Sequence, residues 1–152
     1  MTARIERLDR IAVASRLVEF PALLDAALKA QANARAPYSK FAVGAAVLTG
    51  DGRIFGGCNV ESASYGATIC GERSAIVAAV TAGAKTLRAV VVVTAPPEPS
   101  TPCGICRQLL VEFGTDTAVY AASSTTDIVL ATTVGELLPV SFGAGDLEEA
   151  GL

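Results

Sequence analysis

The segment Leu87 to Thr94 constrains the fold most strongly, because it is apolar at nearly every position. A strand with one face in water alternates apolar and polar residues, whereas a continuous apolar run is typical of a strand that is covered on both faces. Pro96 and Pro97 end the run, since proline has no backbone N–H to donate to a neighbouring strand. We therefore expect a buried central strand with helices on both sides of its sheet.

Helical and extended patterns alternate along the rest of the chain, which has 152 residues and is too short for two ordinary domains. Apolar spacing predicts one amphipathic helix over 15–35 with Pro21 in its first turn, helices after Cys70 and Cys103, and a short helix over 134–138. Strands are predicted over 41–48, 53–60, 118–122 and 128–132, with a turn at 50–52. The prediction is a single α/β domain over 1–152, a three-layer α-β-α sandwich with a mixed sheet of about five strands, in which 1–17 have no assigned role.

The composition excludes several classes of function. The chain has 12 Lys and Arg against 15 Asp and Glu, a net charge of −3, which is the wrong sign for a surface that binds a nucleic-acid backbone. No apolar run approaches the roughly 18 residues of a membrane span, and residues 1–20 lack the pattern of a signal peptide. We therefore expect a cytoplasmic protein with no polynucleotide partner and no membrane partner.

The chain has no histidine, so any transition-metal site must use its four cysteines. Cys103 and Cys106 form a C-x-x-C pair on the first turn of a predicted helix, where both thiolates point the same way and the helix N-terminus favours their negative charge. Cys70 precedes another predicted helix, and both helix starts should lie at the same edge of the sheet. Three thiolates are therefore expected to share one metal ion.

The fourth cysteine decides what such a site can do. Three thiolates with a vacant position describe a catalytic zinc, whereas four protein ligands describe a structural zinc. Because Cys58 lies in a predicted strand, we interpret it as a buried apolar residue and expect an open site. A structural zinc module, in which Cys58 is the fourth ligand, is the alternative from another class of function.

Two charged residues follow Cys70 closely. Glu72 lies two residues after it, so its carboxylate can reach a bound water rather than the metal, which is the position of a proton shuttle. Three thiolates leave a zinc ion with a net negative charge, which Arg73 is placed to offset. These positions predict hydrolytic chemistry.

Five segments occur in one order along the chain: PYSKF at 37–41, GCNVESASYG at 57–66, CGER at 70–73, TPCGICRQ at 101–108 and LLPVSFG at 137–143. In this order and spacing they resemble the small homotetrameric cytidine deaminases, a family of zinc enzymes. The similarity covers roughly residues 24–147, from Leu24 to Leu147.

The resemblance implies hydrolysis of cytidine and deoxycytidine to uridine and deoxyuridine with release of ammonia, in pyrimidine salvage. Cys70, Cys103 and Cys106 would hold one Zn²⁺ per chain, whose bound hydroxide would attack C4 of the base while Glu72 moves the protons. The resemblance also implies a set of substrate contacts: Phe41 on the base, Asn59 and Glu61 on the ribose hydroxyls, the backbone of Gly71 near the base, and Tyr65 and Phe142 across the interfaces of a homotetramer with shared active sites.

Three positions depart from the family pattern. Gly71 stands where alanine is usual, Ser62 where asparagine is usual and Ala144 where proline is usual. A deaminase of another aminated nucleoside, of the blasticidin type, is the alternative enzyme, and the segment 59–61 argues against it.

Overall fold

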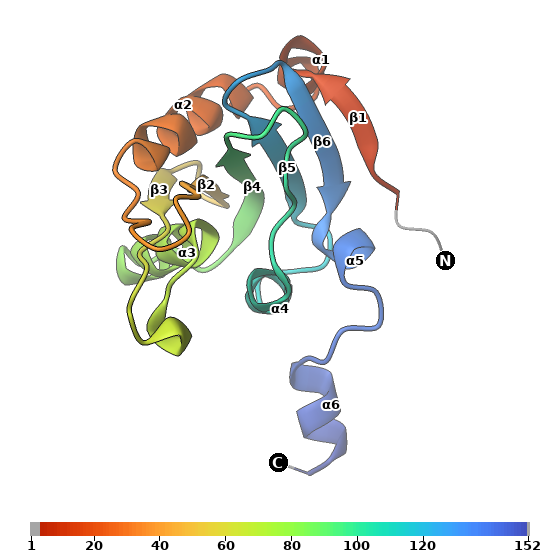
Figure 1. Cartoon of the computed structure of the whole chain (residues 1–152). Coiled ribbons are helices and arrows are strands. Elements are labelled where there is room, and N and C mark those ends of the chain that lie inside the picture. The colour runs from red at the N-terminus through yellow and green to blue at the C-terminus, as the bar shows by residue number, and fades with distance from the viewer. Residues whose placement is uncertain (1–3, 152) are drawn as a thin grey trace.

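The computed structural model describes residues 4–151, which form a six-stranded sheet with helices on both faces (Figure 1). The strands are β1 (Glu6–Asp9), β2 (Gly44–Thr49), β3 (Ile54–Cys58), β4 (Leu87–Thr94), β5 (Ala118–Ser123) and β6 (Ile128–Thr133), in the order β1-β6-β5-β4-β2-β3. The helices are α1 (Arg10–Arg16), α2 (Phe20–Gln31), α3 (Gly71–Thr81), α4 (Gly104–Val111), α5 (Val134–Leu137) and α6 (Ala144–Glu149), with a 3-10 turn at Tyr65–Ala67. The predicted α-β-α sandwich is confirmed, with six strands instead of about five.

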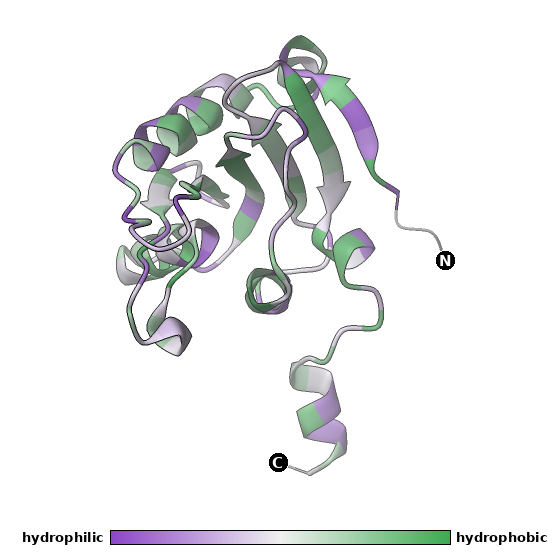
Figure 2. Ribbon diagram, viewed as in Figure 1, coloured by the Kyte–Doolittle hydropathy of each residue, from purple (hydrophilic) through white to green (hydrophobic). Residues whose placement is uncertain are grey.

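The sheet is mixed, because β4 and β5 are parallel and the other neighbouring pairs are antiparallel. β4 is buried at every position except Arg88, so the predicted central strand is confirmed. Its side chains alternate between two cores: Val91 packs with Leu23 of α2, and Val90 packs with Ile76 of α3 and Leu110 of α4. Figure 2 shows the apolar character of these central strands. No helix within the described residues is long and apolar enough to cross a membrane.

The prediction of one helix over 15–35 is wrong. α1 ends at Arg16, Leu17 is extended (φ −132°, ψ 104°), and α2 begins at Phe20. Pro21 explains the break, because in a continuous helix its ring would clash with the carbonyl group of Leu17. Pro21 does lie in the first turn of α2, as predicted.

The sixth strand, β1, comes from the segment 1–17, of which residues 1–3 lie outside the described residues. β1 pairs antiparallel with β6, from Glu6 opposite Ala131 to Asp9 opposite Ile128. It escaped the prediction because four residues with charges at three positions are too short to show a strand pattern. β1 is a strand because it pairs with β6, and its own four residues do not indicate a strand.

Two glycines allow helices to approach the sheet at backbone distance. A Cβ atom at Gly57 of β3 would lie 2.2 Å from the backbone nitrogen of Ala75 in α3. One at Gly44 of β2 would lie 2.0 Å from the carbonyl oxygen of Ala27 in α2. The contact at Gly57 fixes the depth at which α3, with its N-terminal residues, sits on the sheet.

Candidate active site

Two helix N-termini meet at one edge of the sheet and bring three thiols together. Cys70 is the N-cap of α3, Cys103 is the N-cap of α4, and Cys106 lies in the first turn of α4. The Sγ atom of Cys103 is 3.6 Å from that of Cys70 and 3.6 Å from that of Cys106, and all three lie within 4.8 Å of one another. A tetrahedral zinc with bonds of about 2.3 Å to sulfur places its sulfurs about 3.8 Å apart, so the three thiols fit this ion.

Cys58 lies outside this group. It is half-buried at the end of β3, and its Sγ atom is 3.6 Å from the carbonyl oxygen of Asn33. Among the described residues, the thiols of Cys70, Cys103 and Cys106 form a group that could hold a metal ion, and Cys58 is not part of it. The arrangement is therefore one of three thiols, which leaves a coordination position free for a water molecule or substrate.

Glu72 is the second residue of α3 and is buried, with 3% of its surface exposed. It lines a cavity of about 290 Å³ together with Cys70 and Cys103. Burial raises the pKa of the Glu72 carboxyl above the usual value, and the charge of Cys70 adds to this effect. A carboxyl group that readily keeps a proton beside a metal site is suited to take up and return protons.

Arg73 stabilises negative charge on the sulfur atoms. Its Nη2 atom donates a hydrogen bond to the carbonyl oxygen of Thr68 (2.7 Å) and lies 3.9 Å from the Sγ atom of Cys70. Hydrogen bonding from Cys106, with further contributions from Cys103 and Arg73, lowers the pKa of Cys70. The site thus favours the thiolate form of Cys70, whereas the hydrogen bond with Cys70 and burial raise the pKa of Cys106.

The predicted substrate residues fall into three groups. Phe41, Asn59 and Gly71 line the same cavity as Cys70 and Glu72. Glu61 and Tyr65 line a neighbouring hollow of about 430 Å³, and Thr68 belongs to both linings. Phe142 lines neither; it is 59% exposed, and its carbonyl oxygen accepts a hydrogen bond from Gln108 (2.8 Å).

Asn59 and Glu61 hold the segment that carries Phe41. The Oδ1 atom of Asn59 accepts from the backbone N–H of Val43 (2.9 Å), and its Nδ2 atom donates to the carbonyl oxygen of Phe41 (2.8 Å). Glu61 accepts from the backbone N–H groups of Tyr38 (2.9 Å) and Ser39 (3.2 Å). The hydroxyl of Ser39 also donates to Glu61, and these contacts lower the pKa of the Glu61 carboxyl. Both side chains are fixed in place, and that of Glu61 carries a negative charge.

Some residues of the site were absent from the prediction. The cavity wall includes apolar and hydroxyl side chains from several loops and strands, namely Val43, Thr68, Val92, Thr94, Ser100 and Thr101. Arg107 donates to the carbonyl oxygens of Pro102 (2.7 Å) and Leu137 (3.0 Å) and to the hydroxyl of Thr101 (2.9 Å), so it holds the loop that precedes Cys103. Thr101 and Arg107 could have been predicted from the sequence, because they flank the C-x-x-C pair.

Residues 20–122 match the family model described as the cytidine and deoxycytidylate deaminase zinc-binding region. The chain belongs to this family. It is 45% identical over 123 residues to the cytidine deaminase of Sporosarcina psychrophila, which covers 80% of this chain and 90% of that protein. It is 43% identical over 128 residues to the cytidine deaminase of Halalkalibacterium halodurans, which covers 84% of this chain and 96% of that protein.

A solved structure of the family has the same fold. The crystal structure of cytidine deaminase from Burkholderia pseudomallei superimposes with a TM-score of 0.76 at 45% identity, over 80% of this chain and 98% of that one. The family resemblance predicted from the sequence motifs is confirmed. The match to the family model begins at the start of α2, so β1 and α1 lie outside it.

Proposed function

We propose that this chain hydrolyses cytidine and deoxycytidine to uridine and deoxyuridine with release of ammonia, a reaction of pyrimidine salvage. One observation carries the proposal: three thiols lie within 4.8 Å of one another, and two of them, Cys70 and Cys103, line one cavity with the buried carboxyl of Glu72. The similarity to cytidine deaminases over most of both chains supports the same activity.

Cys70, Cys103 and Cys106 would hold one Zn²⁺ per chain. Zinc bound there supplies a Lewis acid that makes water reactive at neutral pH. Arg73, near Cys70, offsets the negative charge of the three thiolates, and the N-termini of α3 and α4 add to this effect.

Glu72 would move the protons of the reaction. Its carboxylate takes a proton from the attacking water and delivers it to N3 of the cytosine ring while the oxygen bonds to C4. It then carries the second proton to the amino group, and the bond from C4 to nitrogen breaks to release ammonia. Burial of Glu72 favours this role, because its raised pKa lets the carboxyl hold each proton between the two steps.

The two adjoining hollows suit the two halves of a nucleoside. We propose that the base lies in the hollow with Glu72, against Phe41 and the backbone of Gly71. The ribose would extend from this hollow, where Asn59 lies, past Thr68 into the neighbouring hollow, where the charged carboxylate of Glu61 lies; both side chains would accept hydrogen bonds from its hydroxyls. Polar groups that are already fixed lower the entropic cost of binding.

We propose a homotetramer in which neighbouring subunits complete each site. Tyr65, which lines the hollow with Glu61, is 78% exposed in a single chain. Phe142, in the segment between α5 and α6, is 59% exposed, and both are large aromatic side chains. Contact with another copy would cover them and bring them to substrate. Sedimentation equilibrium that finds a monomer would contradict the tetramer.

We also propose a cytoplasmic location, because free thiols persist in a reducing compartment.

The test measures zinc per chain and turnover on the same sample. The protein is incubated with cytidine, deoxycytidine and blasticidin S, and loss of absorbance of the aminated base is followed together with ammonia. The proposal predicts about one zinc per chain and equal amounts of uridine and ammonia from cytidine. Zinc with turnover of blasticidin S alone would select the alternative enzyme, and zinc with no turnover would contradict both.

A further inference from the structure

The loop between β4 and α4, residues 95–103, forms one wall of the active-site cavity and ends in Cys103. Ser100 and Thr101 contribute to that wall. The backbone N–H of Ser100 in this loop donates to the hydroxyl of Thr94, the last residue of β4 (3.3 Å). The position of this loop therefore affects both the cavity and a proposed metal ligand.

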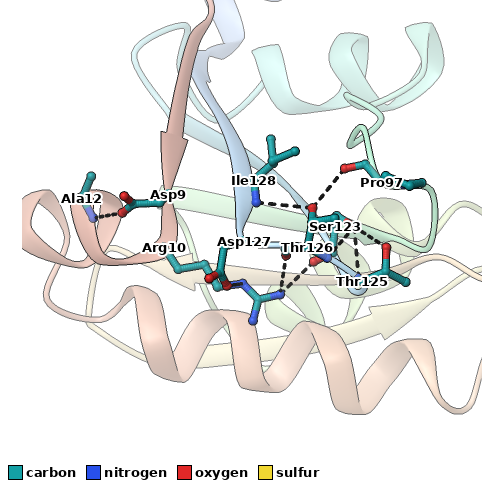
Figure 3. A network of polar contacts seen from close by, with 9 residues as sticks. All are labelled: Asp9, Arg10, Ala12, Pro97, Ser123, Thr125, Thr126, Asp127 and Ile128. Carbon is teal, nitrogen blue, oxygen red and sulfur yellow. Dashed lines mark hydrogen bonds and ion pairs between the residues drawn. The ribbon is translucent and has the colours of Figure 1, made fainter.

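The turn between β5 and β6, residues 124–127, holds the first half of the loop. The hydroxyl of Thr125 donates to the carbonyl oxygen of Ala95 (2.9 Å). The hydroxyl of Thr126 donates to the carbonyl oxygen of Pro97 (3.0 Å), as Figure 3 shows. The position of the loop thus depends on the position of the turn.

Arg10, the first residue of α1, holds this turn from its other side (Figure 3). Its Nη2 atom donates to the carbonyl oxygens of Ser123 (2.8 Å) and Thr126 (3.1 Å), and its Nε atom lies 3.6 Å from the carboxylate of Asp127. Asp9 caps α1 by accepting from the backbone N–H of Ala12 (2.7 Å), which fixes the helix start. Thr126 joins the two sets of contacts, because its carbonyl accepts from Arg10 and its hydroxyl donates to the loop.

A second contact joins the same segment to the loop directly. The Nη1 atom of Arg7 in β1 is 2.6 Å from the Oε1 atom of Glu98. Both side chains are more than half exposed, at 56% and 59%, so solvent weakens this pair. The side chain of Arg10 is 32% exposed, and its contacts with backbone carbonyls are the stronger restraint.

We propose that the N-terminal segment 6–16, which lies outside the family match, positions the β4–α4 loop, and that Arg10 acts through Thr126 as the main positioning residue. Loss of this restraint loosens the first half of the loop and allows the wall at Ser100 to move, so substrate binds less well. Arg107 still holds Thr101 and Pro102, so Cys103, the other two thiols and Glu72 stay in place. The expected change in KM rests on the proposed function, whereas the expected change in amide hydrogen exchange does not.

The test compares Arg10→Gln with Arg16→Gln. Both arginines lie in α1 and pair with an acid, but Arg16 contacts Glu6 (3.1 Å) and does not contact the turn. Amide hydrogen exchange is measured by mass spectrometry for peptides covering 95–103 and 71–81, with kcat, KM and zinc per chain on the same samples. We expect faster exchange at 95–103 and a KM raised about 3- to 30-fold in Arg10→Gln only, below the ~100-fold cost of a displacement of about 1 Å.

Other outcomes would overturn the proposal. Unchanged exchange at 95–103 in Arg10→Gln means that the segment does not restrain the loop. Faster exchange at both 95–103 and 71–81 means that Arg10 supports global stability only. Equal effects of the two substitutions mean that the turn contacts are irrelevant. If the unsubstituted chain lacks deaminase activity, the proposed function fails, but the exchange comparison still decides this proposal.

Thr126→Val provides a second variant that tests the route of the effect. It removes the hydroxyl that contacts Pro97 and keeps the carbonyl that contacts Arg10. If Arg10 acts through Thr126, the double variant should have nearly the same KM and loop exchange as the more impaired single variant. Additive effects would overturn the route through Thr126.

Discussion

Gly57→Ala should displace the helix that carries Glu72. The added Cβ atom would lie 2.2 Å from the backbone nitrogen of Ala75, whereas ordinary contact begins near 3.4 Å, so α3 and β3 must separate by about 1.2 Å. The groups in contact are backbone atoms of α3, which cannot rotate away. A displacement of about 1 Å in a catalytic group can lower the rate by ~100-fold. We therefore expect kcat/KM to fall by about 10- to 100-fold.

The same overlap should lower stability. Overpacking typically costs about 1–3 kcal/mol, which for a chain of this size lowers the Tm by about 2–12 °C. Gly56→Ala is the matched control: it is the neighbouring residue of β3, and its added Cβ atom would lie 3.3 Å from the carbonyl oxygen of Ala26 in α2, away from α3. Steady-state kinetics and thermal unfolding of both variants provide the measurement. Full kcat/KM in Gly57→Ala, or equal losses in both variants, would refute the reasoning.

Three further substitutions have expected outcomes. Gly71→Ala should raise the Tm by up to about 4 °C and keep activity, because its Cβ atom would lie 3.4 Å from Val43 and alanine lowers the entropy of the unfolded chain; a lower Tm would contradict this. Cys58→Ala should leave zinc per chain unchanged; loss of zinc would favour the alternative of a structural zinc module in which Cys58 is the fourth ligand. Arg107→Gln should cost about 1–3 kcal/mol in denaturant unfolding, through lost hydrogen bonds such as that to Pro102; unchanged stability would contradict this.

The sequence was sufficient to predict the position of a residue where that position depends on local structure. Cys70, Cys103 and Cys106 stand at helix starts, and helix starts can be read from apolar spacing. The central strand β4 was equally clear, because burial on both faces leaves a continuous apolar run. Glu72 followed from its spacing to Cys70.

The sequence was insufficient where a residue acts through a distant partner. Thr94 and Thr68 enter the same cavity from different parts of the chain, and no local pattern marks them. Arg10 contacts the carbonyl groups of Ser123 and Thr126, which lie 113 and 116 residues later in the chain, and β1 is a strand because β6 offers a free edge. The helix break before Pro21 was readable in principle, since proline excludes the carbonyl group four residues earlier, but the apolar spacing continued across it.

Glu72→Gln tests the central claim most directly, because it removes the proton carrier and keeps the size of the side chain and the three thiols. Zinc per chain, the Tm and kcat for cytidine are measured on Glu72→Gln and on the unsubstituted protein. The account predicts about one zinc in both proteins, a Tm at least as high in the variant, and a kcat lower by at least ~100-fold. A kcat within about threefold of the unsubstituted protein would contradict the account, because general acid–base catalysis is worth more than that.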